Sequence, residues 1–513
     1  MSYSSKLEHL IEGLGGCGLM QKLICIIIHS STIVIVWSVL AMSFIGYDPG
    51  FKCHILDVKF SSLSVLNLSE MSTNRLCSVG RNATCSAYAF HDKMNTAVSE
   101  YGSICSRQDK IVNQVVGDRI SSTSYILYHA TSSWNLVCDR RWIVAFITSI
   151  QMVGDAVGAI VAGQMADAAG RKPAMLTGIT AMVLFNFVGY FTQSWQIYSV
   201  VRFFIGVGVG ISFTVQFTQM IEFVPSPWRP FVVCFPSEPL SSMLYALVSW
   251  WLHDWKRIHL LKTLIGVFIL TTLCFVPESF RWLISKKKFE HAERSISSLA
   301  TVNGVPKPDV KEIFDTAATD INKTSKATTV FAMYTAWYCM SLGMESISVD
   351  IYLTIFLINL VDLPAFSVTG PLVNRFGRKK YCFVVCGVSS ILMCVSGILQ
   401  HFDKISRPSM SLAVAALAVS LLAKMTVTTA SIALIIYTTE IYPTVVRSIG
   451  YGFQSTVGRL GAVAAPLLIH LDGRIPGLMY FTCGVLIFLS AGSIARLKET
   501  KGVTLPDSIS DTK

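Results

Sequence analysis

Three ionisable residues stand inside long apolar stretches of the sequence and are the first candidates for chemistry: Asp155, Lys424 and Arg459. If those stretches cross a lipid bilayer, a charge near mid-membrane costs about 2.5–3.5 kcal/mol and requires a counter-charge. Asp155 can supply one counter-charge for the two cations, and an anionic group of a substrate can supply another. Alternatively, Asp155 contacts a substrate cation, or it forms a structural ion pair with Arg459 while Lys424 donates hydrogen bonds to backbone carbonyls.

The composition supports a membrane protein, since 52% of the 513 residues are hydrophobic and only 14% are charged, against about 25% charged in soluble domains. A bilayer core about 30 Å thick takes roughly 20 apolar residues of helix. Twelve such stretches are expected: 23–46, 142–166, 174–194, 197–221, 230–252, 258–277, 328–345, 350–373, 380–400, 411–436, 446–469 and 475–495. The first is longer than the apolar core of a signal peptide and should remain as an anchor. We therefore predict an all-α polytopic protein with 12 transmembrane helices.

Basic residues predict the orientation of these helices. Arginine and lysine concentrate in short loops on one side, in the long segment 279–326 and in the tail 496–513. By the positive-inside rule these parts are cytoplasmic, so most of the net charge of +11 sets topology and does not indicate nucleic acid. The segment 1–22 is then cytoplasmic as well, and the chain is expected to be a multi-pass plasma-membrane protein. Its helices divide into two halves, 23–278 and 327–495.

The segment 47–141 must then be extracellular. It holds two glycosylation sequons, at Asn67 and Asn82, which are used only on that side. It also holds five cysteines, which should oxidise into two disulfides with one cysteine left over and with open connectivity. These are Cys53, Cys77, Cys85, Cys105 and Cys138.

Two short motifs occur in both halves of the chain. Gly163-Gln-Met-Ala-Asp167-Ala-Ala-Gly170-Arg171-Lys172 has the spacing of Gly370-Pro-Leu-Val-Asn374-Arg-Phe-Gly377-Arg378-Lys379. Each follows the second span of its half. Glu222-Phe-Val-Pro225-Ser-Pro-Trp-Arg229 and Glu440-Ile-Tyr-Pro443-Thr-Val-Val-Arg447 share a second pattern after the fourth span. A duplicated bundle of six plus six helices, as in many secondary transporters, follows from the repeats.

The repeated motifs also suggest a gate. A carboxylate such as Asp167 can favour the dipole of a neighbouring helix, and Glu222 and Glu440 can pair with nearby arginines. Single surface pairs contribute only about 0–1 kcal/mol. As a cluster formed in one conformation they could determine which side is closed, although they could also merely orient loops. The predicted gating residues are Gly163, Asp167, Gly170, Arg171, Lys172, Glu222, Arg229, Asn374, Gly377, Arg378, Glu440 and Arg447.

These motifs resemble the signature of the major facilitator superfamily, and a narrower resemblance covers about 130–500. Trp134-Asn-Leu-Val-Cys138-Asp139, Pro277-Glu-Ser-Phe-Arg281-Trp-Leu and Tyr437-Thr-Thr-Glu440-Ile-Tyr-Pro443-Thr-Val-Val-Arg447 resemble sequences of the organic cation, anion and carnitine transporters, solute carrier family 22. Several positions depart from that pattern. Ala168 stands where the family usually has arginine, Asn374 where the first half has aspartate, and Phe280 replaces a proline. The outer loop also has five cysteines where relatives commonly have six.

The resemblance bears on the substrate. Lys424 and Arg459 match positions where carnitine-type and anion-type members carry lysine and arginine, whereas simple cation transporters carry aspartate at the equivalent of Arg459. A zwitterion such as carnitine, or an organic anion, is therefore favoured, with organic cations as the alternative. Phe366, where anion transporters often have lysine, counts against an anion. Further expected contacts with the substrate are Trp337, Tyr338, Phe217 and Gln216, since aromatic faces attract ammonium groups by about 0.5–2 kcal/mol.

Other classes of function fit less well. The sequence has no P-loop, HExxH, GxSxG or Cys/His spacing typical of a metal site, so we expect no enzyme, metal or cofactor. Midplane charges on duplicated halves favour alternating access over a channel. A relative that no longer transports and acts as a receptor or scaffold remains a third possibility, because of Ala168 and Asn374. The coupling ion, sodium or proton, and the oligomeric state are left open.

Overall fold

The computed structural model describes residues 3–45, 51–55, 85–90, 142–252, 254–306, 328–343, 351–405, 410–441, 447–472, 475–495 and 499. This part of the chain is almost entirely helical. The long helices are α2 (Leu19–Ile45), α7 (Trp142–Ala168), α8 (Arg171–Tyr190), α9 (Trp195–Phe223), α11 (Ser237–Leu252), α12 (Trp255–Leu273), α16 (Thr328–Gly343), α17 (Ile351–Phe376), α18 (Arg378–Ile405), α19 (Met410–Ile441), α20 (Arg447–Asp472) and α21 (Leu478–Ile494). Shorter elements are α1 (Tyr3–Gly13), η2 (Ser226–Trp228), α10 (Arg229–Val233), α13 (Phe280–Ser285) and α14 (Phe289–Asn303).

A helix lies over each of the twelve expected spans. By length and composition, eight segments of the described chain are able to cross a membrane. The four other expected spans are too short or too polar to be included in that group. The helices α16 and α21 are only 16 and 17 residues long, and α12 and α20 carry basic residues along their length. The predicted helical membrane fold is confirmed, with the addition of one two-stranded ribbon.

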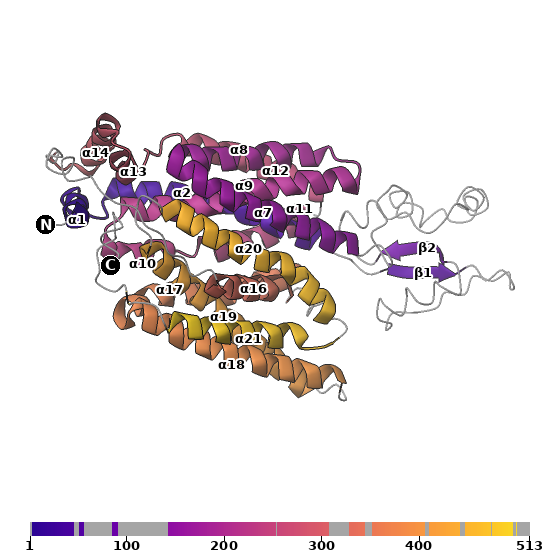
Figure 1. The fold of residues 1–513 in the computed structure, drawn as a ribbon. Coiled ribbons are helices and arrows are strands. Elements are labelled where there is room, and N and C mark those ends of the chain that lie inside the picture. Colours follow the sequence, from indigo (N-terminus) through magenta and orange to yellow (C-terminus); the bar gives the residue numbers. More distant parts are fainter. Residues whose placement is uncertain are drawn as a thin grey trace.

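The long helices pack as two halves (Figure 1). Helices α2, α7–α9, α11 and α12 contact one another in the first half, and α16–α21 do so in the second. The halves meet where α7 packs along α20 and where α11 packs along α17. At the α7–α20 contact a Cβ added to Gly452 would lie 3.1 Å from the Cα of Gly163, so small residues allow the two halves to approach closely.

Glycines also set the distance between α7 and α9. A Cβ at Gly158 would lie 2.2 Å from the carbonyl oxygen of Val207, and a Cβ at Gly210 would lie 2.1 Å from the carbonyl oxygen of Asp155. Such distances leave no room for any side chain, so the backbones touch directly. This contact fixes the position of Asp155 within the bundle.

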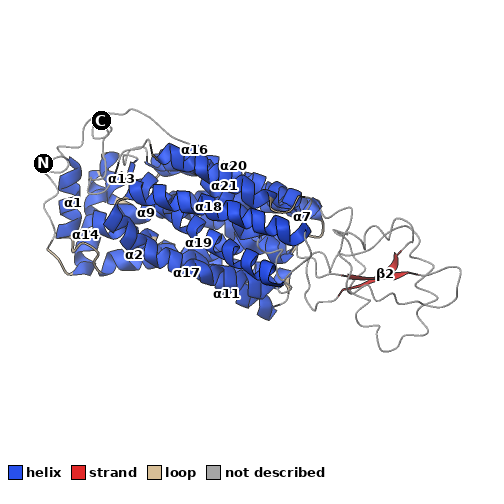
Figure 2. Ribbon diagram, turned by 90° about the horizontal axis from the view of Figure 1, so that it is seen from below, coloured by secondary structure: helices blue, strands red, loops and turns tan. Residues whose placement is uncertain are grey.

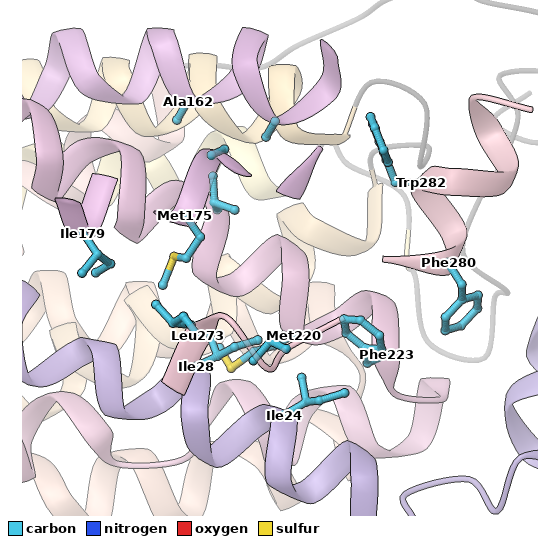
Figure 3. Close-up of a cluster of buried hydrophobic side chains, with 14 of the residues drawn as sticks. Ile24, Ile28, Ala162, Met175, Ile179, Met220, Phe223, Leu273, Phe280 and Trp282 are labelled. Carbon is cyan, nitrogen blue, oxygen red and sulfur yellow. The ribbon is translucent and has the colours of Figure 1, made fainter. Parts of the chain in front are cut away.

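The two ends of the bundle differ in structure. Helices α1, α13 and α14 gather at one end, and the strands β1 (Phe51–Ile55) and β2 (Cys85–Phe90) lie at the other (Figures 1 and 2). Figure 3 shows how α13 packs on the first half: Phe280 and Trp282 join a buried apolar cluster that includes Phe223, whose ring centroid lies 6.0 Å from that of Phe280. Phe280, the residue that replaces the proline of the family pattern, is thus a packing residue.

The strands β1 and β2 form a two-stranded antiparallel ribbon inside the segment 47–141. It was not anticipated from the sequence. Cys53 and Cys85 lie on these strands, but their side chains lie outside the described part, as do Asn67, Asn82, Cys77, Cys105 and Cys138. The predicted disulfides and glycosylation therefore stay predictions. Among cysteines whose side chains are described all are free, and most are buried in the helices.

Candidate functional site

A cavity lies between the two halves and is lined by residues of α2, α7, α9, α11, α16, α17, α19 and α20. Its ionisable lining residues are Asp155, Glu238, Asp362, Lys424 and Arg459. The three midplane charges singled out in the sequence thus face one space. Polar and aromatic residues complete its wall, among them Trp337, Tyr338, Ser341, Thr428 and Phe213.

The first charge pair in the cavity joins the two halves. Arg459 on α20 approaches Asp155 on α7 with 2.6 Å between Nε and Oδ1, and both side chains are 2% exposed. Arg459 also donates a hydrogen bond to Ser455 one turn earlier and lies over the ring of Phe213 at 5.4 Å. The second carboxylate oxygen of Asp155 accepts no hydrogen bond in the described part. Asp155 therefore keeps one oxygen for a further partner.

The second charge pair lies within the second half. Lys424 on α19 stands 3.4 Å from Oδ2 of Asp362 on α17, and it donates a 2.7 Å hydrogen bond to Ser341 on α16. Thr428, one turn beyond Lys424, donates to Oδ1 of the same carboxylate at 2.9 Å. Lys424 thus has a carboxylate and a hydroxyl as partners, where the sequence suggested backbone carbonyls.

A third carboxylate, Glu238 on α11, extends this group across the interface between the halves. It lines the same cavity and interacts electrostatically with both Lys424 and Asp362. With all groups ionised, the five ionisable lining residues carry three negative and two positive charges. The chain thus supplies the second counter-charge that we had assigned to a substrate anion. Charge neutrality of the cavity therefore gives no reason to expect an anionic substrate.

The aromatic predictions divide into two groups. Trp337 and Tyr338 line the cavity with their ring centroids 5.0 Å apart, and Lys424 lies 4.9 Å above the Trp337 ring. Phe217 and Gln216 are not among the lining residues. Gln216 donates a 2.7 Å hydrogen bond to Thr32, and Phe217 packs against Phe213, which lines the cavity one turn earlier on α9.

Residues of both repeated motifs form a buried cluster at the helix ends of the first half. Arg171, fully buried, contacts both oxygens of Glu222 at 3.0 and 3.2 Å and Oδ1 of Asp167 at 3.0 Å. Two parallel contacts between a guanidinium and a carboxylate are strong and directional. Because these three residues belong to one half, the cluster joins α7, α8 and α9. A role in gating stays a prediction.

A carboxylate closes the start of the third helix in each half. Glu278 accepts the backbone N–H groups of Arg171 at 3.0 Å and Lys172 at 3.2 Å. Glu499 accepts those of Arg378 at 2.8 Å and Lys379 at 3.2 Å. Both carboxylates satisfy N–H groups that a helix start leaves unpaired. The sequence repeat therefore has a third member that motif reading missed, an acidic residue after the sixth span of each half.

The glycine in front of each of these helices is required by the geometry. Gly170 has φ +121 and Gly377 has φ +93, conformations that a residue with a side chain rarely adopts. A Cβ at Gly170 would lie 2.3 Å from Oε2 of Glu278, and one at Gly377 would lie 2.8 Å from Oε2 of Glu499. The repeated Gly-Arg-Lys sequence thus combines a backbone turn with room for a capping carboxylate.

We expect Gly170→Ala to destabilise the protein. The backbone conformation alone should cost about 1–3 kcal/mol, and the added methyl group displaces Glu278 from the helix start. Thermal unfolding of the purified protein measures the loss. Gly387→Ala on α18 is the matched control, because its Cβ meets nothing within 4 Å. Equal unfolding temperatures for the two variants would contradict this role of Gly170.

The helix α1 adds a further carboxylate at this end. Glu8 contacts Arg229 after η2 and lies 2.7 Å from Arg281 on α13. Burial raises the pKa of Glu8, but Arg281 and Arg229 outweigh that effect and hold it below its usual value. The stabilisation from this carboxylate is therefore complete at neutral pH and is lost only as the pH falls below about 4.5. Arg229, a predicted gating residue, thus pairs with α1.

The matching residues of the second half are described less fully. Arg378 is buried, and Asn374 is partly buried at the end of α17. Glu440 lies in the last turn of α19 and Arg447 begins α20, and the side chains of both lie outside the described part. Whether they pair as Arg171 and Glu222 do stays a prediction.

Comparison with known proteins identifies a family model and relatives that this chain resembles. The family model described as sugar (and other) transporter matches residues 83–345. The chain is 25% identical to solute carrier family 22 member 4 of Mus musculus, over 98% of this chain and 94% of that protein. It is 28% identical to organic cation/carnitine transporter 2 of Homo sapiens over 74% and 70%, and 27% identical to the organic cation transporter protein of Drosophila melanogaster over 100% and 94%.

Solved structures agree on the fold. A partially occluded inward-open structure of the xylose transporter XylE from E. coli superposes with a TM-score of 0.60 at 15% identity, covering 94% of this chain and 99% of that one. The human organic anion transporter MFSD10 superposes with a TM-score of 0.55 at 14% identity, over 92% and 99%. The relatives are membrane transporters and not enzymes. The chain therefore belongs to the sugar (and other) transporter family of the major facilitator superfamily, and the relatives named above include a member of solute carrier family 22.

Proposed function

We propose that this protein carries a zwitterion with an ammonium and a carboxylate, of the carnitine type, across the plasma membrane by alternating access. The observation that carries the proposal is the cavity between the halves, where acidic and basic side chains face the same space. A substrate carboxylate can approach Arg459 or Lys424, and its ammonium can approach Glu238 or the free oxygen of Asp155. Relatives named as organic cation/carnitine transporters support this choice.

Two electrostatic interactions across the interface suggest how binding would lead to transport. Asp155 pairs with Arg459 between α7 and α20, and Glu238 on α11 attracts Lys424 on α19 across the cavity that both line. A zwitterion that takes over one member of each interaction replaces attraction between the halves by attraction to itself. A ligand shifts a conformational equilibrium only by its differential affinity for the two states. This exchange of partners would let the bound substrate weaken the interactions that hold one side of the transporter closed.

The proposed topology follows the charge distribution and the two dissimilar ends of the bundle. We place 1–22, 279–326 and 496–513 in the cytoplasm with α1, α13 and α14, and 47–141 with the β ribbon outside. The halves 23–278 and 327–495 then lie in the membrane. For coupling, a proton or sodium remain the candidates, and the structural neighbour described as a proton:xylose symporter is compatible with the former.

An organic cation is the second candidate substrate, because the ionisable cavity residues sum to one negative charge when all of them are ionised. An organic anion is less favoured, since both cations of the cavity already have carboxylate partners. A receptor or scaffold without transport is the alternative of another class, suggested by Ala168 and Asn374. Arg171 nevertheless keeps a full set of partners beside Ala168, which favours an intact helix-end cluster.

Uptake into expressing cells tests these alternatives. We expect saturable uptake of labelled carnitine, weaker uptake of tetraethylammonium and none of hippurate, compared with cells expressing Asp155→Asn/Arg459→Gln. Repeating the carnitine measurement without sodium and across a pH step identifies the coupling ion. Uptake of hippurate alone would overturn the proposed substrate class, and uptake of none of the three by protein at the cell surface would favour the receptor.

A further inference from the structure

Two basic residues of the first half lie away from the cavity and have no acidic partner among the residues that the structure describes. Arg202 on α9 and Lys262 on α12 are both 0% exposed. Both lie about two turns from the start of their helices, each one turn beyond a member of the hydrogen bond between Tyr198 and His259, so that their charges repel each other. In the described part of the chain, Nε and Nη2 of Arg202 and Nζ of Lys262 find no hydrogen-bond acceptor.

Three polar neighbours of these residues are engaged with one another. Asn186 donates from its amide to Met182 at 2.8 Å, so its oxygen accepts from Nδ1 of His259 at 3.0 Å. The remaining ring nitrogen of His259 then accepts the hydroxyl of Tyr198 at 3.1 Å. This chain of hydrogen bonds leaves His259 a neutral imidazole with no acceptor to offer Lys262.

Arg202 is compensated only in part. One of its N–H groups donates to the backbone carbonyl of Ser38 at 3.1 Å, and its guanidinium lies 5.1 Å from the ring centroid of Tyr198. No ion pair of either Arg202 or Lys262 occurs among the described residues. Arginine cannot lose its proton in a protein, and a buried charge without a partner is strongly unfavourable. The pair therefore needs an anion or a neutral lysine.

We propose that Arg202 and Lys262 bind a small inorganic anion of the halide type between α9 and α12. The unused N–H groups of both side chains are its ligands. A single negative charge there would be attracted by both cations and would accept the hydrogen bonds that the protein leaves unmade. The site is structural and separate from the cavity, so its test does not depend on the proposed substrate.

Thermal unfolding of the purified full-length protein tests the site, with sodium chloride titrated against sodium gluconate at constant ionic strength. We expect a saturable rise in Tm of about 2–4 °C in chloride for the native protein. Lys262→Gln should lose this rise. Arg257→Gln, which removes the same charge from a largely exposed position of the same helix, should keep it.

A second variant keeps the test decisive if Lys262→Gln misfolds. Lys262→Arg retains the charge and should retain the chloride response, even if Lys262→Gln cannot be purified. A native protein with the same Tm in chloride and gluconate would overturn the proposal and indicate that Lys262 is neutral. A chloride response of equal size in Lys262→Gln would overturn it as well, because chloride would then act elsewhere on the protein.

Discussion

Replacing Arg459 with glutamine should lower carnitine uptake at least 100-fold. The substitution leaves Asp155 with no partner in a buried position, and breaking a buried ion pair from one side costs about 3–5 kcal/mol. It also removes a proposed contact for the substrate carboxylate and the ionic link between α7 and α20. Initial uptake rates, normalised to the amount of protein at the cell surface, measure the effect.

The double variant Asp155→Asn/Arg459→Gln separates the structural part of this effect from binding. With both charges removed, the unpaired carboxylate is gone and thermal stability should return towards that of the native protein. Uptake should not return, because the substrate contact is still missing. Recovery of both stability and uptake in the double variant would show that the pair is purely structural and would contradict a role of Arg459 in binding.

Glu238→Gln should weaken the binding of cationic and zwitterionic substrates about 10- to 100-fold. The substitution keeps the shape of the side chain but removes the acidic group on the first-half side of the Lys424–Asp362 pair. A quaternary ammonium has no N–H to donate, so the interaction lost is a charge–charge attraction. It amounts to about 3 kcal/mol at roughly 5 Å for an effective dielectric constant of about 20, and the cost of desolvation brings the expected loss below that value. The KM of tetraethylammonium and carnitine uptake measures it, since the ammonium is the group concerned.

Glu293→Gln is the matched control for this experiment, because Glu293 is exposed on α14, far from the cavity lining. It should leave both KM values unchanged. If Glu238→Gln raised the KM of hippurate but not of tetraethylammonium, the ammonium would not bind at this carboxylate. That result would reverse the proposed orientation of the substrate.

The sequence predicted the helices and the central charges because both rest on one strong physical constraint. Charges are costly in a bilayer, so Asp155, Lys424 and Arg459 stood out against their apolar surroundings. The repeat indicated that these three residues could face one cavity, because it places α7 and α20 on facing sides of the two halves. The spacing of residues along the chain could not specify the distances between the three side chains.

Other residues were missed although the same signal marked them. Asp362, Arg202 and Lys262 also lie in expected spans, and Glu238 follows shortly after the start of another. The family resemblance concerns only the two basic positions and gives no indication of these four. Asp362 pairs with Lys424 within the second half, which weakens the argument for an anionic substrate.

Packing explains why Phe217 and Gln216 were harder to place. A helix presents side chains at intervals of about 100°, so a small error in its rotation exchanges Phe217 for Phe213, one turn earlier, as the lining aromatic. The sequence also does not show why glycine is needed at 170 and 377. The motif indicates a turn, but only the structure shows that a side chain at either position would clash with Glu278 or Glu499.

The most direct test of the central claim is equilibrium binding of labelled carnitine to the purified protein, with tetraethylammonium and hippurate as competitors. If the cavity accepts a zwitterion through Glu238 and Arg459, carnitine binds and tetraethylammonium displaces it, while hippurate at the same concentration does not. Binding should also fall at least tenfold in Glu238→Gln and stay unchanged in Glu293→Gln. Displacement by hippurate but not by tetraethylammonium, with binding unchanged in Glu238→Gln, would contradict the account.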